Sequence, residues 1–348
     1  MKIEVSAIEG PYLKDILDQP RSLDATLSSL DCPKELMVLA EKLNGGAFRA
    51  VILTGMGSSF HALHPLNLEL IRHGFTSFMV ETSELVHHQS RLLDRSTLVI
   101  AVSQSGQSAE VLRLLEMNQG KAPVIAVTNT PNSTLAEKAD AAIATAAGKE
   151  FSVSCKTYVT ALMGLTWLGT FLVHGNMQNV RAELSDASRM VQIYLNDWER
   201  HVASFAGLLN EVRQIFLVGR GASLAAAGTG ALIIKESDHF PAEGMSSASF
   251  RHGPFEMLKK GTFVLAFAGE HPTRELNEKL VRDIREQAGR AELVGEDTIP
   301  CCALPAASVA LRPILEILPA QMITLALAAQ VGREPGRFEL ASKVTSVE

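Results

Sequence analysis

A run of small hydroxyl residues separates a predicted strand from a predicted helix. Residues 97–102 are typical of a buried strand, a helical pattern covers 108–117, and the run Ser103-Gln104-Ser105-Gly106-Gln107-Ser108 joins them. The unpaired N–H groups and the dipole of a helix N-terminus favour an anion. Because one helix cap needs only one hydroxyl, three serines favour a bound phosphate over simple capping. Ser103, Gln104, Ser105 and Ser108 are therefore the candidate phosphate ligands.

A glycine loop, Gly55-Met56-Gly57-Ser58-Ser59, follows another predicted strand at 50–53. Its residues Gly57, Ser58 and Ser59 are expected to assist at the same phosphate. Neither loop carries the lysine of a GxxxxGK[ST] loop, which disfavours a nucleoside triphosphate. The loop also lacks the third glycine of a dinucleotide-binding loop, and no acidic residue follows the second strand at the right distance. A sugar phosphate is the anion that these residues favour.

The elements that must position these loops are short apolar strands that alternate with helices. Strands are predicted over 50–53, 77–80, 97–102 and 124–127, and again over 214–218, 240–243 and 262–267. Such alternation is typical of parallel sheets covered by helices on both faces. A second G-x-G-x-S loop follows the strand at 214–218, which indicates an internal duplication. For this second loop a simple tight turn stays an open alternative.

Composition fits this architecture and disfavours several other classes of protein. The chain has 348 residues, enough for two domains, and is 47% hydrophobic but only 5% aromatic, as expected for aliphatic strands and Ala-rich helices. A net charge of −6 gives no electrostatic footprint for nucleic acid. The four cysteines show no metal-ligand spacing, so we expect reduced thiols and neither a metal nor a cofactor.

No segment is predicted to direct the chain to a membrane. The N-terminus lacks the apolar core of a signal peptide. Charged residues or proline interrupt the apolar stretches near 151–173 and 314–331, which are better explained as buried helices than as membrane spans. We therefore expect a cytoplasmic protein.

Seven ordered motifs resemble those of the sugar isomerase (SIS) domain family, in particular the isomerase half of glucosamine-6-phosphate synthases and the stand-alone amino-sugar-phosphate deaminases. In chain order they are Leu17-Asp18-Gln19-Pro20-Arg21, Gly57-Ser58-Ser59, Ser103 to Ser108, Thr128-Asn129 with Pro131, Lys235-Glu236, Arg251-His252-Gly253-Pro254 and Leu340 to Glu348. The resemblance covers nearly the whole chain. It implies two tandem SIS domains, each a doubly wound parallel sheet flanked by helices.

The expected organisation follows from this resemblance and from the predicted elements. It comprises an N-terminal helical segment at 1–40, a first SIS domain at 41–180, a linking helix at 181–209, a second SIS domain at 210–335 and a C-terminal active-site tail at 336–348.

Three residues acquire catalytic roles only through the resemblance. Glu236 ends an apolar helical stretch, where burial would raise the pKa of its carboxyl and suit it to move a proton between C1 and C2 of a sugar; the sequence alone favours an ordinary solvated glutamate. The resemblance implies that His252 opens the sugar ring in the neighbouring subunit of a homodimer. It also implies that Lys343 forms a Schiff base with the open-chain ketose, which needs a neutral amine. Ser154 is implied to bind substrate.

The chain departs from the synthase pattern at three places. We expect that the glutaminase domain is missing; Met56 replaces a cysteine, and Ile233 replaces a lysine three residues before the glutamate. Ser154 also lies one residue closer to Glu150 than in the synthases. Without a glutaminase, we expect an enzyme that converts glucosamine 6-phosphate, or a related amino-sugar phosphate, to fructose 6-phosphate and ammonia.

Three alternatives stay open. The first two are a deglycase that acts on a fructosamine 6-phosphate and a simple aldose–ketose phosphosugar isomerase. The third is a phosphosugar sensor, which the presence of both halves and of Glu236, His252 and Lys343 disfavours.

Overall fold

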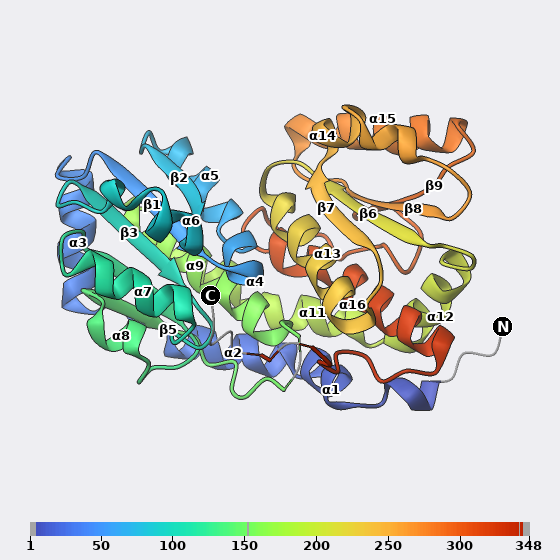
Figure 1. Ribbon diagram of the computed structural model, residues 1–348, viewed down its shortest axis with the longest axis horizontal. Coiled ribbons are helices and arrows are strands. Elements are labelled where there is room, and N and C mark those ends of the chain that lie inside the picture. The colour runs from blue at the N-terminus through green and yellow to red at the C-terminus, as the bar shows by residue number, and fades with distance from the viewer. Residues whose placement is uncertain (1–4, 152, 341, 344–348) are drawn as a thin grey trace. The chain divides into compact units, whose positions relative to one another are not determined.

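A computed structural model describes residues 5–151, 153–340 and 342–343. Contacts divide the chain into two compact units. Of the described residues, one unit, built around the first sheet, takes in 21–149, 156–185 and 342–343. The other, built around the second sheet, takes in 5–20, 150–151, 153–155 and 186–340. The α/β fold class predicted from the sequence is confirmed (Figure 1).

The first sheet has five parallel strands in the order β2-β1-β3-β4-β5. The strands are β1 (Ala50–Gly55), β2 (Ser77–Glu81), β3 (Thr97–Val102), β4 (Val124–Thr128) and β5 (Ala141–Ala144). All six residues of β1 and of β3 are buried, which their unbroken apolar character predicts for a sheet covered on both faces. The fifth strand, β5, was not predicted because three of its four residues are alanine, which is depleted in strands.

Helices cover both faces of the first sheet. They are α2 (Gln19–Ser29), α3 (Lys34–Asn44), α4 (Gly57–His61), α5 (His64–Arg72), α6 (Thr82–His87), α7 (Ala109–Asn118), α8 (Thr134–Lys138), α9 (Lys156–Leu172) and α10 (Met177–Ser185), with the short η2 (Ser90–Leu92). The apolar stretch near 151–173 is the buried helix α9, as predicted. One core cluster joins Ile52 and Val99 in the sheet to Val111 and Leu114 on α7.

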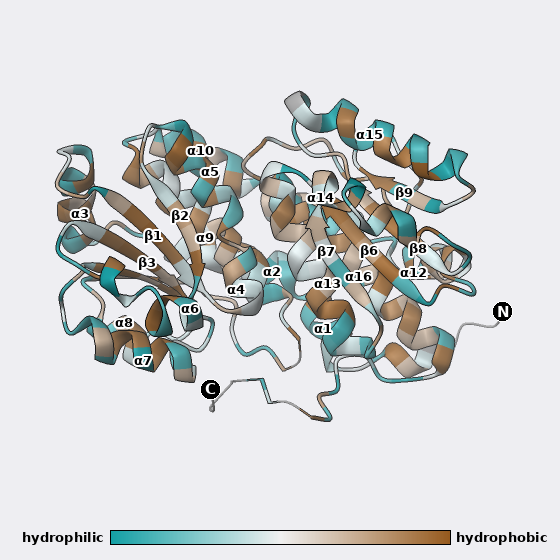
Figure 2. Cartoon of the chain, turned by 45° about the horizontal axis from the view of Figure 1, so that its top comes forward, coloured by the Kyte–Doolittle hydropathy of each residue, from teal (hydrophilic) through white to brown (hydrophobic). Residues whose placement is uncertain are grey.

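The second sheet has four parallel strands in the order β7-β6-β8-β9. They are β6 (Gln214–Gly219), β7 (Ala242–Ser246), β8 (Thr262–Phe267) and β9 (Arg290–Val294). The order repeats that of β2-β1-β3-β4, which confirms the predicted duplication. The position of β5 is reduced to a single bridge between Gly295 and Ala303. Figure 2 shows the apolar colour concentrated on the strands of both sheets.

Helices also flank the second sheet. They are α1 (Pro11–Leu17), α11 (Ala187–Leu195), α12 (Trp198–Leu208), α13 (Leu224–Asp238), α14 (Ser247–Arg251), α15 (His271–Glu286) and α16 (Arg312–Val331), with the short η1 (Val5–Ile8), η3 (Gly221–Ser223) and η4 (Pro254–Met257). The stretch 181–209, expected as one linking helix, instead contains the end of α10 followed by α11 and α12. The breaks fall at Asp186 and at Asn196-Asp197, residue types that favour turns.

Helix α16 is the central helix of the second unit. It is long and apolar enough to cross a membrane, but 89% of its apolar window is buried inside the protein, as predicted for 314–331. It packs closely on α13, where a Cβ added to Gly230 would lie 3.0 Å from Ala320 Cβ. Small residues at this crossing let the two helix backbones approach each other.

Candidate active site

The loop that joins β3 to α7 holds Ser103, Gln104, Ser105 and Ser108 at the carboxyl edge of the first sheet. Its carbonyls face the neighbouring loop: Gln104 O accepts from Asn129 N–H at 3.1 Å, and Gly106 O accepts from Leu135 N–H at 3.1 Å. Ser103 Oγ accepts from Gly106 N–H at 3.1 Å and thereby closes the turn. Ser108 precedes α7 but makes no side-chain capping bond. The loop is thus held by its carbonyls, next to the positive end of a ten-residue helix.

Gly106 is the residue that this loop conformation requires. Its φ is +62°, in the left-handed region that favours glycine. A Cβ at this position would lie 2.6 Å from Ser133 Cβ and 3.2 Å from Thr128 Oγ1. Ser133 itself caps α8 by accepting from Ala136 N–H at 3.3 Å, so it is not free to move aside. The sequence had shown Thr128-Asn129 as a family motif, but not that this turn supports the phosphate loop.

The glycine loop 55–59 lies beside the serine loop 103–108, because β1 and β3 are neighbours with Gly55 level with Val102. A Cβ on Gly55 would lie 3.0 Å from Val102 O and 3.1 Å from the carbonyl carbon of Ser59. Gly57 has φ +52° and begins α4, which presents the half-buried Ser58 and Ser59. The chain leaves β1 for β2 on one side and returns to β3 on the other. Ligands of open α/β sheets bind at such a reversal of strand order.

Two histidines follow the first loop. His61 and His64 are half-buried, with their rings stacked 6.4 Å apart. Burial, assisted by the nearby His61, lowers the pKa of His64 to about 4. His64 is therefore a neutral imidazole at physiological pH, which can donate or accept a hydrogen bond but brings no charge.

Glu236 lies in the last turn of α13, in the second unit. Ile233 and Ile234 beside it are fully buried, while Lys235 is exposed and Glu236 is half-buried. The turn of α13 that carries Glu236 thus buries two apolar side chains, and the apolar surroundings of the carboxylate stay a prediction. The residues that follow, His239-Phe240-Pro241, lead into β7 at the amino edge of the second sheet.

His252 lies on the other face of the same sheet from α13. It follows α14, which Phe250 anchors by packing its buried ring 5.2 Å from that of Phe216. Arg251 pairs with Asp283 at 2.6 Å, which fixes the turn and leaves His252 exposed. The two catalytic candidates of this unit thus belong to helical segments that cover opposite faces of the sheet, because α13 packs on Leu217 and α14 packs on Phe216. Helix α13 starts at the carboxyl edge and runs about 18 Å before it reaches Glu236.

The remaining predicted residues fall in different parts of the chain. Ser154 is half-buried in the segment 150–155, which packs with the second sheet, and Glu150 Oε1 in that segment accepts from Cys155 N–H at 2.9 Å. Lys343 is half-buried. The family motif around it continues into residues 344–348, which, like Ala341, lie outside the described residues.

The sequence did not single out Glu316 as a site residue. Its carboxylate lies beside the loop after β6, at the position in the second sheet that corresponds to the glycine loop 55–59 of the first sheet. The loop after β6 places Ser223 where the first unit has Ser59, and Ser223 donates to Glu316 Oε1 at 2.9 Å. Glu316 comes from α16 and is 2% exposed, and its Oε2 has no hydrogen-bond partner. Arg312 donates to Gly269 O at 2.6 Å. The cavity that remains beside Glu316 is about 20 Å³, room for about one water. The one feature of the sequence that indicated a buried carboxylate was the glutamate within the apolar stretch 314–331.

Burial raises the pKa of Glu316 from 4.5 to about 7, although the Ser223 hydroxyl and Arg312 oppose the shift. A raised carboxyl pKa stabilises the fold below pH 4.5, and this stabilisation is lost as pH rises through 7. The free energy of unfolding of the wild type should therefore fall by up to about 3 kcal/mol between pH 4.5 and 8 through Glu316 alone. We expect that Glu316→Gln, which cannot ionise, does not show this fall. Denaturant unfolding of both proteins across this range measures it. A difference between them that does not change with pH would contradict this assignment.

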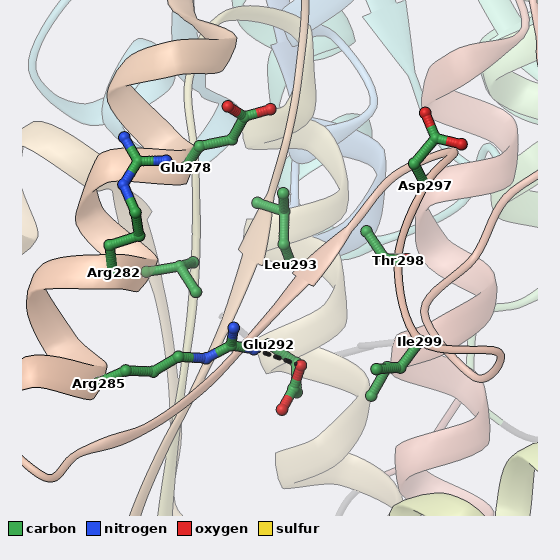
Figure 3. Close-up of a pocket in the computed structure, with 9 residues that line it drawn as sticks. Glu278, Arg282, Arg285, Glu292, Leu293, Asp297, Thr298 and Ile299 are labelled. Carbon is green, nitrogen blue, oxygen red and sulfur yellow. Dashed lines mark hydrogen bonds and ion pairs between the residues drawn. The ribbon is translucent and has the colours of Figure 1, made fainter.

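A separate pocket of about 420 Å³ lies at the open edge of β9. Its lining includes Arg282, Arg285, Glu292 and Asp297, and Arg285 pairs with Glu292 at 2.6 Å (Figure 3). None of the predicted site residues lines it. Among the described residues, no group of three or more His, Cys, Asp or Glu side chains is placed to hold a metal ion.

The fold and the loops define a class of protein: two doubly wound α/β domains, of which the first carries two serine-containing loops at its carboxyl edge. The SIS domain family model matches residues 49–170 and 208–294, and the chain belongs to this family. It is 32% identical, over 99% of its length, to the glutamine–fructose-6-phosphate aminotransferase (isomerizing) of Pyrococcus horikoshii, and spans 59% of that protein.

Two solved structures share the fold. The C-terminal domain of glucosamine-fructose-6-phosphate aminotransferase from Francisella tularensis has a TM-score of 0.82 at 21% identity, with 93% of this chain and 96% of that one covered. A glucosamine-6-phosphate deaminase from Thermotoga maritima has a TM-score of 0.78 at 19% identity, with 97% of this chain and 100% of that one covered.

Proposed function

We propose that the protein is a phosphosugar isomerase that acts as a deaminase. It converts glucosamine 6-phosphate, or a related amino-sugar phosphate, and water to fructose 6-phosphate and ammonia. The observation that carries the proposal is the carbonyl-anchored loop 103–108, whose serines lie at a helix N-terminus on a chain that has Glu236, His252 and Lys343 at the family's motif positions.

The reaction follows from the chemistry of these residues. The serines of both loops hold the phosphate, and His252 assists ring opening to the C1 aldehyde. Glu236 takes the proton from C2 and returns one to C1, so the C2 amine becomes an imine. Water adds to C2 and ammonia leaves, giving the ketose. Lys343 can take part as the amine that exchanges with ammonia at C2 through a Schiff base, which water then releases.

The sugar and the reaction are tested together with purified protein. Glucosamine 6-phosphate, galactosamine 6-phosphate, a fructosamine 6-phosphate adduct and fructose 6-phosphate are each incubated with it, and ammonia and ketose or aldose products are quantified. Ammonia with an equal amount of ketose phosphate supports the deaminase. Release of the adduct's amine indicates a deglycase, and aldose–ketose exchange without ammonia indicates a simple isomerase. Tight binding without turnover indicates a sensor. Each of these three outcomes contradicts the proposed deaminase.

We further propose a homodimer in which His252 serves the partner's site. The placement of Glu236 and His252 on segments that cover opposite faces of one sheet supports this sharing, since one carboxylate and one imidazole must reach the same sugar. Mixing inactive Glu236→Gln and His252→Ala proteins, with exchange of subunits, should restore up to about a quarter of wild-type activity. No recovery in mixtures shown to contain heterodimers would contradict a shared site.

A further inference from the structure

The C-terminal segment after α16 is fastened to the last turn of α13. Gly336 N–H donates to Ser237 O at 3.2 Å, and Arg333 Nη1 donates to Asp238 O at 3.4 Å. Pro335 and Gly336 are both buried at this contact. A backbone hydrogen bond and a guanidinium thus join two segments almost a hundred residues apart in sequence.

Arg333 is the centre of this contact. Its Nη2 lies 3.1 and 3.0 Å from the two ring nitrogens of His239 and donates to Glu339 Oε1 at 3.2 Å. Glu339 Oε2 in turn lies 3.9 Å from His239 Nδ1. One side chain therefore joins two residues at the end of α13, Asp238 and His239, to Glu339 of the C-terminal segment. We call His239, Arg333 and Glu339 the tail clamp.

The neighbouring Asp238 leaves Arg333 available for Glu339. Asp238 Oδ1 is buried without a hydrogen-bond partner, and burial raises the pKa of this carboxyl to about 8, against the opposing effects of Ser237 and Arg333. The carboxyl is therefore mostly neutral at pH 7. Glu339 is the carboxylate that pairs with the guanidinium.

The clamp connects two candidate catalytic residues through the chain. Glu236 precedes His239 by three residues, within one helical turn. Lys343 follows Glu339 by four residues, a length of chain that reaches at most about 14 Å. Fixing Glu339 therefore restricts where the Lys343 amine can go, and fixing His239 holds the turn that carries Glu236.

We propose that Arg333 is a positioning residue that, through the tail clamp, fixes Glu339 on the end of α13 and so limits how far the segment that carries Lys343 can move. Its effect on turnover rests on the proposed function, whereas its effect on the order of the tail does not. The arginine fork matters here because a lysine has a single ammonium and cannot reach the Asp238 carbonyl, the imidazole and Glu339 together.

The test compares Arg333→Met with Arg337→Met, an exposed arginine of the same segment that is no part of the clamp. Amide hydrogen exchange of peptides covering 337–343 should quicken at least tenfold in Arg333→Met and stay within twofold in Arg337→Met. On whichever substrate the wild type turns over, kcat should fall at least tenfold in Arg333→Met with KM within threefold. Arg333→Lys should recover part of the loss.

The outcomes separate the two proposals. Unchanged exchange over 337–343 in Arg333→Met, or a kcat within twofold of wild type, would overturn the positioning role. If the wild type turns over no sugar phosphate, the proposed function fails, and the exchange experiment still decides whether the clamp orders the tail. Should Arg333→Met not fold, Glu339→Gln removes one arm of the clamp at an exposed site and should give the same changes at smaller size.

Discussion

Glu236→Gln lowers kcat by a factor of about 10² to 10⁴, the range that a positioned general acid–base group contributes, while KM stays within a few-fold. Glutamine keeps the size and polarity of the side chain but cannot accept the C2 proton. Because the phosphate loops lie in the other unit, substrate affinity should survive. Steady-state kinetics on the substrate identified by the assay panel measure both constants.

The matched control is Glu243→Gln, an exposed glutamate on β7. It makes the same change of charge in the same unit and should leave kcat within twofold. Exchange of the C2 hydrogen with solvent deuterium, followed by NMR, isolates the proton-transfer step and should disappear in Glu236→Gln. Full deuterium exchange in this variant would assign the proton transfer to another residue.

Gly106→Ala raises KM for the sugar phosphate at least a hundredfold. The new Cβ cannot be accommodated at φ +62° beside Ser133, so the loop must move away from the turn that holds Gln104 O and Gly106 O. A displaced loop no longer aims its hydroxyls and helix N-terminus at one point. Isothermal titration with the sugar phosphate measures the loss directly.

Gly120→Ala is the control for backbone strain alone. Gly120 has φ +72° but no atom within 4 Å of an added Cβ, so alanine there should cost about 1 kcal/mol of stability and no affinity. Thermal unfolding separates the two effects, since both variants lose stability and only Gly106→Ala should lose binding. Normal affinity in a folded Gly106→Ala protein would show that the loop does not hold the phosphate.

The sequence was a good guide wherever a local pattern determines the structure. The buried strands β1, β3, β6 and β8 consist mostly of apolar residues. The glycines that follow β1 and β6 correctly predicted the positions of the loops 55–59 and 219–223. The strands β5 and β9 were missed because AAIA and RAELV carry weak or mixed signals, and they pair at sheet edges where tertiary contacts decide.

The candidate site was only partly accessible to such reasoning. The serines of the loop 103–108 could be predicted as anion ligands because they precede a predicted helix. The support of Gly106 by Ser133 and the crevice filled by Glu316 depend on contacts between segments 27 to 93 residues apart, which no local pattern encodes. The roles of Glu236, His252 and Lys343 came from the family motifs and stay predictions.

The filled crevice of the second unit bears on how a duplicated fold diverges. After a duplication, two copies of a ligand crevice are redundant, and an emptied one would leave buried polar groups without partners. Here the Glu316 side chain from α16 occupies the space beside Ser223, so the second copy keeps its sheet and its helices without a ligand at that loop. A chain with two such domains therefore binds fewer ligands than it has domains. We expect a binding titration to give one sugar phosphate per chain.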